Sequence, residues 1–303
     1  MLGRSSRTRI AGVDALLVVG SGKGGVGKST VSVNLAVALA KQGAKVGLLD
    51  GDAYGPSVPM MLGVRKRGES QGWQASLPLA HQGKITPEQK LKPLLRYGVK
   101  IMSVGFFIGE EQSVAPIPDV LGILIRQLLF LVDWGTLDYL IIDLPPGNGE
   151  PQATLCRELE LDGAVLVTTP QDIARIDTAK ALSMFQGVQV PVLGVVQNMD
   201  GLLCPHCGER INVFPSSHES RLLLDALPLL GSIPVDPATV TSGDKGRPIV
   251  ISQAESPVSQ AFLYIAEQVT TILRARRMAR DADTAIIETE TEESAKGELP
   301  DNE

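Results

Sequence analysis

Six short runs of apolar residues recur along the chain, each bounded by glycine, polar or charged positions. They cover residues 15–19, 45–49, 99–104, 140–143, 163–168 and 192–197. Runs of this length that are apolar at nearly every position are typical of strands buried on both faces of a parallel sheet. We therefore expect these segments to form a central sheet.

Longer segments between the runs carry apolar residues at three- and four-residue steps, which predicts helices. The predicted helices cover residues 31–41, 119–132, 172–185 and 256–278. The helix over 172–185 places four large apolar residues on one face, which we expect to pack in the core: Ile173, Ile176, Leu182 and Phe185. Strands alternating with helices predict an α/β fold with a doubly wound, mostly parallel sheet.

The composition fits this fold class. The chain has 303 residues, of which 44% are hydrophobic but only 4% aromatic, so the core is built from aliphatic side chains. This length suits one large α/β domain with extensions, or two small domains. We expect one domain over residues 13–280, which the final helix closes by packing one apolar face on the sheet.

The net charge of −6 is concentrated at the C-terminal end. Residues 281–303 hold nine acidic residues and one lysine, which leaves 25 acidic and 27 basic residues in the rest of the chain. We expect residues 281–303 to be a disordered acidic tail. The nearly neutral body shows no charge footprint of a nucleic-acid-binding protein, so no nucleic-acid partner is expected. Arginines at the end of the final helix suit the helix dipole.

Two other segments lack periodicity. Residues 1–12 carry three arginines and are expected to form a flexible basic arm; a mitochondrial transit peptide is the alternative, but the arm is short for one and lacks an amphipathic helix. Residues 64–97, with seven basic and two acidic residues, are expected to be a solvated surface insertion with a short hairpin, although a basic stretch also suits an acidic client.

A glycine-rich loop links the first apolar run to the first helix. Its residues satisfy the phosphate-binding P-loop pattern G-x-x-x-x-G-K-[ST]: Gly22, Lys23, Gly24, Gly25, Val26, Gly27, Lys28, Ser29 and Thr30. Strand, loop and helix in this order let backbone N–H groups and the helix N-terminus face a polyphosphate. We expect Lys28 to reach the β- and γ-phosphates of ATP and Ser29 to bind Mg²⁺.

Carboxylates follow two of the apolar runs. Asp50 and Asp52 come directly after the second run, and Asp143 ends the run over 140–143. The carboxyl ends of parallel strands border the crevice in which α/β proteins bind ligands, so these residues are candidates for the Mg²⁺ shell and for orienting an attacking water. An aspartate-rich turn is the alternative for Asp50 and Asp52. The turn 144–150 after Asp143, with two prolines and two glycines, is suited to adopting two positions near a γ-phosphate.

Polar residues after the last apolar run complete the candidate chemistry. Asn198 ends that run, and either caps a turn or bonds the adenine edge. Cys204 and Cys207 form a C-x-x-C knuckle that can direct two thiolates at one metal ion. This pair is half a site, because zinc and iron–sulfur clusters typically take four protein ligands. His206 and His218 are candidates to complete a zinc site, a redox pair is a further alternative, and Cys156 is expected to be a buried small residue.

The loop containing both Lys23 and Lys28 resembles that of the deviant Walker A ATPases, which include MinD, ParA, the nitrogenase iron protein and the Mrp/ApbC iron–sulfur carriers. The segments D-x-D-x-x-G-P-S at 50–57, D-x-P-P-G-x-G-E at 143–150 and N-M…C-P-H-C-G at 198–208 resemble the Mrp/ApbC carriers in particular. The resemblance extends over residues 15–273.

The resemblance implies a homodimer in which Lys23 reaches the nucleotide of the other subunit. It implies that Asp52 positions the nucleophilic water, that Asp50 supports the metal and that Asn198 contacts adenine. In such a dimer the Cys204 and Cys207 pairs of two chains bridge one [4Fe–4S] cluster. The implied function is an ATP-hydrolysing carrier that receives a cluster from a scaffold donor and transfers it to apoprotein clients.

Three departures from the family stand out. We expect no counterpart of the small N-terminal domain that is frequent in the family, and segments 115–118 and 214–220 differ from its usual Arg-Gly-Pro and glycine-rich stretches. Two other functions stay open: a MinD/ParA-like positioning ATPase, and an ATPase with a structural zinc at the C-x-x-C. Few cysteines and the absence of a secretory or membrane-spanning run favour a cytoplasmic protein with no membrane partner.

Overall fold

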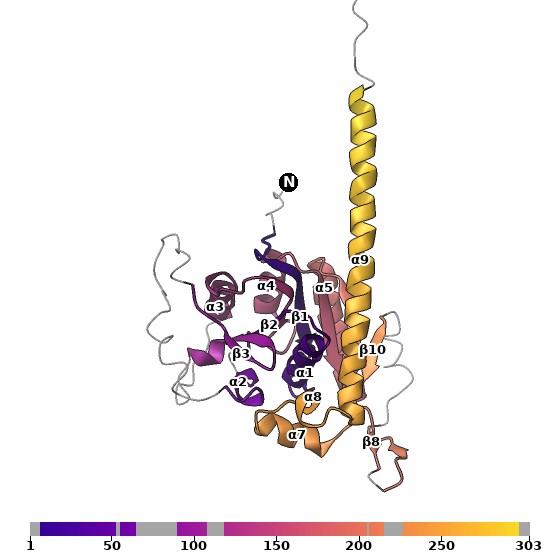
Figure 1. The fold of residues 1–303 in the computed structure, drawn as a ribbon. Helices are drawn as coiled ribbons and strands as arrows, with labels where there is room; N and C mark the ends of the chain where they lie inside the picture. Colours follow the sequence, from indigo (N-terminus) through magenta and orange to yellow (C-terminus); the bar gives the residue numbers. More distant parts are fainter. Residues whose placement is uncertain are drawn as a thin grey trace, which may run out of the picture.

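Parallel strands form the centre of the molecule (Figure 1). The structure is a computed structural model that describes residues 7–52, 55–64, 90–107, 118–204, 206–214 and 227–296, with the backbone alone at 118–122 and 283–296. The strand order in the main sheet is β10-β7-β6-β1-β5-β2-β4-β3. Its parallel strands are β1 (Val13–Ser21), β2 (Val46–Asp50), β4 (Val99–Ser103), β5 (Leu137–Asp143), β6 (Gly163–Thr168), β7 (Val192–Gln197) and β10 (Leu229–Ser232). The doubly wound, mostly parallel fold class is confirmed.

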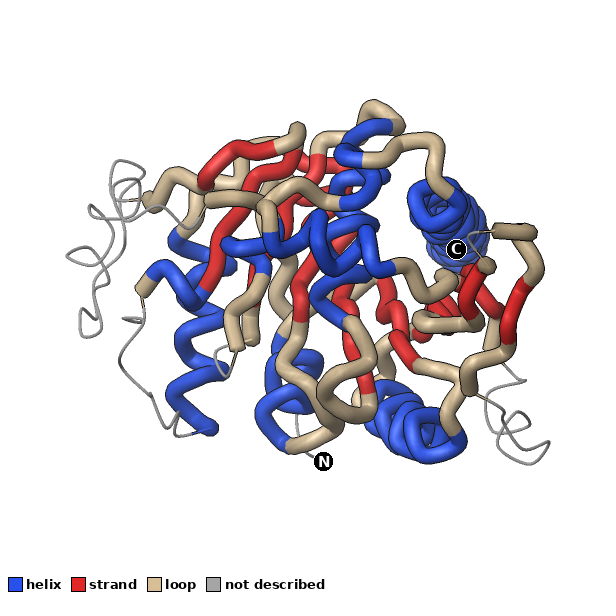
Figure 2. The backbone as a smooth tube through the Cα atoms, turned by 90° about the horizontal axis from the view of Figure 1, so that it is seen from below, coloured by secondary structure: helices blue, strands red, loops and turns tan. Residues whose placement is uncertain are grey.

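Helices cover both faces of this sheet (Figure 2). On one face, α1 (Lys28–Lys41) packs against α9 (Pro257–Lys296). The other face carries α3 (Pro118–Leu131), α4 (Glu150–Glu158) and α5 (Asp172–Gly187). Three short helices pack beside α1 and against one another: α2 (Val58–Met61), α7 (Pro237–Asp244) and α8 (Ile249–Ser252).

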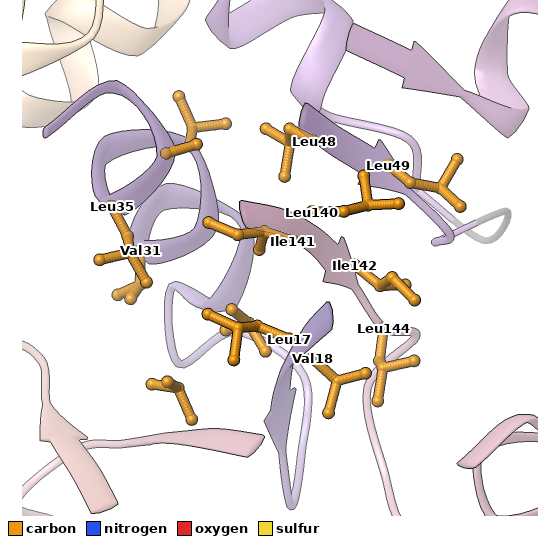
Figure 3. Close-up of a cluster of buried hydrophobic side chains, with 14 of the residues drawn as sticks. Leu17, Val18, Val31, Leu35, Leu48, Leu49, Leu140, Ile141, Ile142 and Leu144 are labelled. Atoms are coloured by element: carbon orange, nitrogen blue, oxygen red, sulfur yellow. The ribbon is translucent and has the colours of Figure 1, made fainter. Parts of the chain in front are cut away.

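The core explains why the central strands are apolar at nearly every position. Leu17 of β1 and Leu48 of β2 both pair with Ile141 of β5, so the three side chains share one face, while the next residue of each strand faces the opposite layer. Figure 3 shows this cluster together with Val31 and Leu35 of α1. Both faces are dry, and each of these side chains is buried.

The first and last parts of the chain differ from their expected disorder. Thr8 forms a parallel bridge with Leu159, in which its N–H donates to the Glu158 carbonyl at 2.8 Å, and Ile10 is buried in the core. Residues 7–12 of the expected flexible arm are therefore attached to the domain by backbone pairing and by one buried apolar side chain. Residues 1–6 lie outside the described residues.

The final helix is longer than its apolar face predicted. Helix α9 runs to Lys296, into the segment expected to be a disordered acidic tail, and projects beyond the rest of the domain (Figure 1). Residues 279–296 contain no glycine or proline, and Gly297 follows the last turn, which accounts for this length.

The arginines of α9 consequently lie in mid-helix rather than at its C-terminus, so the helix dipole does not explain them. Arg277 lies 4.0 Å from Asp14, and Arg280 lies 3.7 Å from Asp162. Both carboxylates stand near the amino ends of strands, so these arginines attach α9 to the edge of the sheet opposite the glycine-rich loop.

The predicted core face of α5 is partly wrong. Phe185 is buried and Leu182 packs against the core, but Ile173 is 61% exposed and Ile176 is 45% exposed. The sheet-facing stripe consists instead of small residues with Phe185 at its end: Ala174, Thr178 and Ala181. Small residues are required there because α5 approaches the backbone of the glycine-rich loop closely.

The expected insertion over 64–97 lies mostly outside the described residues. Its last part forms β3 (Leu94–Arg96), which pairs antiparallel with β4 through a tight turn. A second, two-stranded sheet is formed by β8 (Leu202–Leu203) and β9 (Arg210–Ile211). Among the described helices, none combines the length and the apolar composition that crossing a lipid bilayer demands.

Candidate functional site

The strand register gathers the predicted carboxylates at one edge of the sheet. Asp50 at the end of β2 is the register partner of Asp143 at the end of β5 and also of Ser103 at the end of β4. Val19 of β1 is the other partner of Asp143, so the loop that follows β1 begins beside the same group. The topology thus brings the loop and the two strand-end carboxylates together, as the sequence predicted.

Two glycines fit the loop to its surroundings. A Cβ on Gly22 would lie 2.1 Å from the carbonyl carbon of Asp177, so only glycine lets the loop meet α5. Gly27 precedes α1 with φ of +84°, and a Cβ there would lie 2.2 Å from Nδ2 of Asn198. Gly24 and Gly25, in contrast, are exposed and face open space.

A cavity of about 200 Å³ opens beside these exposed glycines. Its lining includes both lysines of the loop, the first turn of α1 and the turns after β2 and β5: Lys23, Lys28, Ser29, Asp52 and Pro146. Open backbone at Gly24 and Gly25 beside two lysines and a helix N-terminus fits a polyphosphate.

Lys28 is the only loop lysine that the described residues engage in an ion pair. Its ammonium is buried and lies 2.8 Å from Oδ1 of Asp143 and 3.7 Å from Oδ2 of Asp52. The Lys23 side chain is half-buried at the cavity and has no ion pair within the described part of the chain. The two lysines therefore have different environments: one is held inside the site, and the other is available at its surface.

Asp143 is the polar centre of the site. It is fully buried, and it accepts hydrogen bonds from the hydroxyls of Ser29 and Ser32, each at 2.6 Å, besides its ion pair with Lys28. Ser32 was not singled out from the sequence. Its spacing of three residues from Ser29 on a helix was the available signal, since such residues share a face.

Asp50 lies behind this centre and does not reach the cavity. Its Oδ1 accepts the Asp52 N–H at 3.1 Å and its Oδ2 accepts the Ser103 hydroxyl at 2.9 Å. Full burial, followed by the nearby Asp143 charge, raises the pKa of Asp50 to about 8. At neutral pH Asp50 is therefore mostly protonated, and its geometry fixes the backbone that carries Asp52. Ser103 was missed, because its partner depends on strand register.

The turn after Asp143 is held by backbone and side-chain hydrogen bonds. Gly147 has φ of +103°, and its N–H donates to the Ser21 carbonyl at 3.0 Å. The amide of Gln152 donates to the Pro146 carbonyl at 3.0 Å. Gln152 is a positioning residue that the sequence interpretation missed, since nothing in its spacing distinguishes it from other residues of α4.

Asn198 contacts the loop itself. It is 8% exposed, and its Nδ2 donates to the Val26 carbonyl at 2.9 Å. Its own N–H donates to Thr168 at the end of β6, so the side chain is fixed between a strand end and the loop. A contact with adenine stays a prediction, and the contact with the loop is a role that the sequence did not indicate.

The cysteine pair lies on the β8–β9 hairpin, a few residues after Asn198. Cys204 N–H donates to the Glu209 carbonyl, and Gly208 N–H donates to the Cys204 carbonyl, each at 2.9 Å. Cys204 is half-buried and Cys207 is exposed. Backbone N–H groups of Cys207 and His206, in that order, lower the pKa of the Cys204 thiol, which favours the thiolate that binds metals.

This hairpin is half of a metal site within the described residues. No group of three or more His, Cys, Asp and Glu side chains suited to holding a metal ion occurs among them, although His206 stands between the cysteines. His218 lies outside the described residues. Cys156 is buried in α4, where burial raises its pKa to about 12, as expected for a packed apolar thiol.

Comparison with known proteins agrees with this geometry. Residues 12–270 match the family model described as ParA, NUBPL iron-transfer P-loop NTPase. The chain belongs to this family. The matched residues of this chain extend from just before β1 into α9 and include the glycine-rich loop and the cysteine hairpin.

Similar relatives come from distant organisms. The iron–sulfur cluster carrier protein of Aquifex aeolicus is 44% identical over 277 residues, covering 89% of this chain and 71% of the relative. The iron–sulfur cluster transfer protein NUBPL of Mus musculus is 42% identical over 270 residues, covering 88% of this chain and 80% of the relative.

Solved structures share this fold. A nucleotide-binding protein from Archaeoglobus fulgidus, in complex with ADP, has a TM-score of 0.65 and 36% identity, covering 84% of this chain and 94% of its own. The cell division ATPase MinD of Pyrococcus furiosus has a TM-score of 0.63 and 25% identity, covering 86% of this chain and 99% of its own.

Proposed function

We propose that this protein binds and hydrolyses ATP and carries a [4Fe–4S] cluster between two copies of the chain for transfer to apoproteins. The observation that carries the proposal is the exposed cysteine hairpin, which offers two thiols where a cluster takes four ligands. A second copy supplies the missing pair. The names of the relatives, iron–sulfur cluster carrier and transfer proteins, support this cargo.

The nucleotide site supports ATP as the substrate. Gly24, Gly25 and the first turn of α1 provide backbone N–H donors for phosphate oxygens, and Lys28 provides a cation beside them. Ser29 and Asp143 are the residues that would hold Mg²⁺, which neutralises phosphate charge when bound. Both side chains supply the oxygen ligands that this hard cation prefers, and their hydrogen bond already brings the two oxygens together.

Hydrolysis is assigned to the residues around Lys28. The oxygen of a water oriented by Asp52 forms a bond to the γ-phosphorus while the bond to the β–γ bridging oxygen breaks. ADP and phosphate are released, and the water's proton passes to solvent. Asp50 positions Asp52 through the hydrogen bond to its N–H and, being buried with both oxygens bonded, supports the metal site only indirectly.

The second copy completes both sites. Lys23 lies at the cavity without an ion pair in the described part of the chain, so it is available to reach the nucleotide of the other copy. The exposed Ile173 and Ile176 stand on α5, the helix against which Gly22 packs, and supply an apolar surface for the same contact. We assign hydrolysis to cluster transfer, with scaffold proteins as donors and apoproteins as clients.

Thiolate ligands require a reducing compartment, which supports the cytoplasm as the site of action. A relative from Arabidopsis thaliana is named as mitochondrial, so the compartment follows the host cell rather than the fold. The MinD structure supports a shared ATPase fold, whereas the cysteine hairpin gives a positioning ATPase no evident use.

Anaerobic reconstitution with iron and sulfide tests the proposal. We expect about four iron atoms per two chains and a visible absorbance in the wild type, both lost in Cys204→Ala. Cys156→Ala is the matched control, because that thiol is buried elsewhere, and its cluster should be retained. A colourless wild type containing zinc would contradict the carrier function in favour of a structural metal. A cluster that survives Cys204→Ala would contradict the site.

A further inference from the structure

A short, well-anchored segment joins the nucleotide loop to the cysteine hairpin. Its first residue, Asn198, donates to the Val26 carbonyl of the loop at 2.9 Å. Cys204 follows only six positions later along the chain. The segment between them therefore connects the cysteine hairpin to a residue that is hydrogen-bonded to the nucleotide loop, and a rigid segment can carry a displacement from one site to the other.

The segment is fixed on both sides by backbone hydrogen bonds. Asp200 N–H donates to the Ile233 carbonyl at 2.9 Å, and Val235 N–H donates to the Gly201 carbonyl at 2.7 Å. The two partners, Ile233 and Val235, belong to the segment that follows β10. Met199 and Gly201 have positive φ angles of +57° and +75°, so the segment is a tight turn rather than an extended linker.

The hairpin is in turn attached to this turn. Nη2 of Arg210 on β9 donates to the Asp200 carbonyl at 2.7 Å and also pairs with the Asp200 carboxylate. A Cβ on Gly201 would lie 2.9 Å from Nε of Arg210 and 3.1 Å from the Ile211 carbonyl oxygen. The hairpin base therefore rests directly on the turn, and a displacement of the turn moves the hairpin with it.

The other end of the segment is sensitive to the loop. The Asn198–Val26 hydrogen bond is buried, and the Asn198 amide packs directly on Gly27, where a Cβ would lie only 2.2 Å from its Nδ2. Nucleotide binding changes the loop's charge environment by offering phosphates to Lys28, which is now paired with Asp143. A shift of the Val26–Gly27 backbone stretches or breaks this hydrogen bond.

We propose that Asn198 is the positioning residue that couples nucleotide binding to the cysteine pair, by linking the loop backbone at Val26 to the turn 199–201 and the Cys204–Cys207 hairpin. The inference rests on the proposed function and adds its missing connection. Asn198 has two N–H donors and an acceptor oxygen, so bonding an adenine edge leaves the bond to Val26 available. Nucleotide and cluster then change each other's affinity by the same factor.

The test is the ratio of two dissociation constants for ADP with Mg²⁺, measured by calorimetry on the cluster-free and the cluster-loaded protein. We expect the wild-type ratio to differ from one by at least about fivefold. In Asn198→Ala the ratio should fall to about one. Loss of a contact with adenine raises both dissociation constants by the same factor, and this factor cancels in the ratio. The ratio therefore reports the coupling alone.

Two further variants make the test specific. Arg210→Ala removes the attachment at the hairpin end, far from the loop, and should also bring the ratio to about one while leaving ADP affinity of the cluster-free protein unchanged. Gln197→Ala is the matched control, because Gln197 precedes Asn198 but bonds Arg175 of α5 instead of the loop, and it should keep the wild-type ratio.

The outcomes separate the two proposals. A cluster-loaded wild type with a ratio of one, or an Asn198→Ala protein that keeps the wild-type ratio, overturns the coupling role and leaves the carrier function standing. A wild type that takes up no cluster overturns the carrier function. The same ratio, measured with Zn²⁺ on the cysteines in place of the cluster, then decides the role of Asn198.

Discussion

Asp50 and Asp143 are register partners at the last paired position of β2 and β5, and both are fully buried. Two carboxyl groups this close in a dry environment are not both ionised at neutral pH without strong compensation. The structure divides their roles: Asp143 pairs with Lys28, whereas Asp50 receives hydrogen bonds from Ser103 and the Asp52 backbone. One carboxylate binds cations, and the other shapes the turn that carries Asp52.

Stability of the nucleotide-free protein should depend on pH through Asp50. Its folded pKa of about 8 exceeds the unfolded value of 3.8, so the folded state holds the extra proton between these values. The contribution of Asp50 to the free energy of unfolding is therefore complete below about pH 4 and is lost as the pH rises to about 8. Each unit of difference between the folded and unfolded pKa is worth about 1.4 kcal/mol.

Denaturant unfolding of the wild type and of Asp50→Asn at pH 5.5 and pH 8.5 measures this effect. Asparagine keeps the shape without the ionisation, so the variant should gain stability relative to the wild type as pH rises, by about 1 kcal/mol or more. A stability difference that is the same at both pH values would contradict a raised pKa at Asp50.

Replacing Lys28 should abolish ATP hydrolysis. The Lys28→Ala variant lacks the cation that faces the phosphates and leaves Asp143 and Asp52 without their ion pair, so we expect turnover to fall by about 100-fold or more. Lys41→Ala, at the last turn of the same helix, should retain the wild-type rate, because Lys41 bonds the Val250 carbonyl away from the site. Unchanged turnover in Lys28→Ala would refute the assignment.

The close approach of the loop to α5 predicts unequal effects of two alanine substitutions. Gly22→Ala places a Cβ 2.1 Å from the Asp177 carbonyl, and backbone cannot give way as a flexible side chain does, so we expect a loss of about 2 kcal/mol or more in unfolding free energy. Gly24→Ala, in open space on the same loop, should unfold at nearly the wild-type temperature in a thermal melt. Equal melting temperatures for both variants would contradict the packing.

Cys204 and Cys156 should differ in their reaction with iodoacetamide. Hydrogen bonds from the hairpin backbone lower the pKa of Cys204, whereas burial raises that of Cys156 to about 12. In the protein freed of bound metal, the rate at which Cys204 is modified, followed by peptide mass spectrometry, should reach its half-maximum at a lower pH than the rate for a free cysteine, and Cys156 should stay unmodified in the folded protein. Modification of Cys156 before unfolding would show that α4 opens.

The sequence was most informative where burial is complete. Strands β6 and β7 have the predicted bounds because a run buried on both faces must be apolar throughout, and its polar neighbours mark where it ends. Helix α5 was harder: Ile173 and Ile176 look like core residues, yet the helix turns small residues to the sheet. A pattern of apolar positions does not reveal how closely two elements approach.

Side-chain partners were the second limit. The loop, Asp50, Asp52 and Asp143 could be predicted because their order along the chain implies a shared edge of the sheet. Ser103 could not, because its bond to Asp50 depends on which strands are neighbours. The bond from Asn198 to Val26 spans 172 positions and joins two loops whose closeness follows only from the folded arrangement.

The ion pair between Lys28 and Asp143 can be broken at low cost only if both partners receive a new partner of opposite charge. A divalent cation that binds alone must displace the Lys28 ammonium group from the Asp143 carboxylate. A polyphosphate that binds alone attracts Lys28 but is left beside the negative charge of Asp143. Only the two together satisfy both partners of the broken pair. We therefore expect the resting site to bind Mg²⁺ and ATP together more tightly than it binds either one alone.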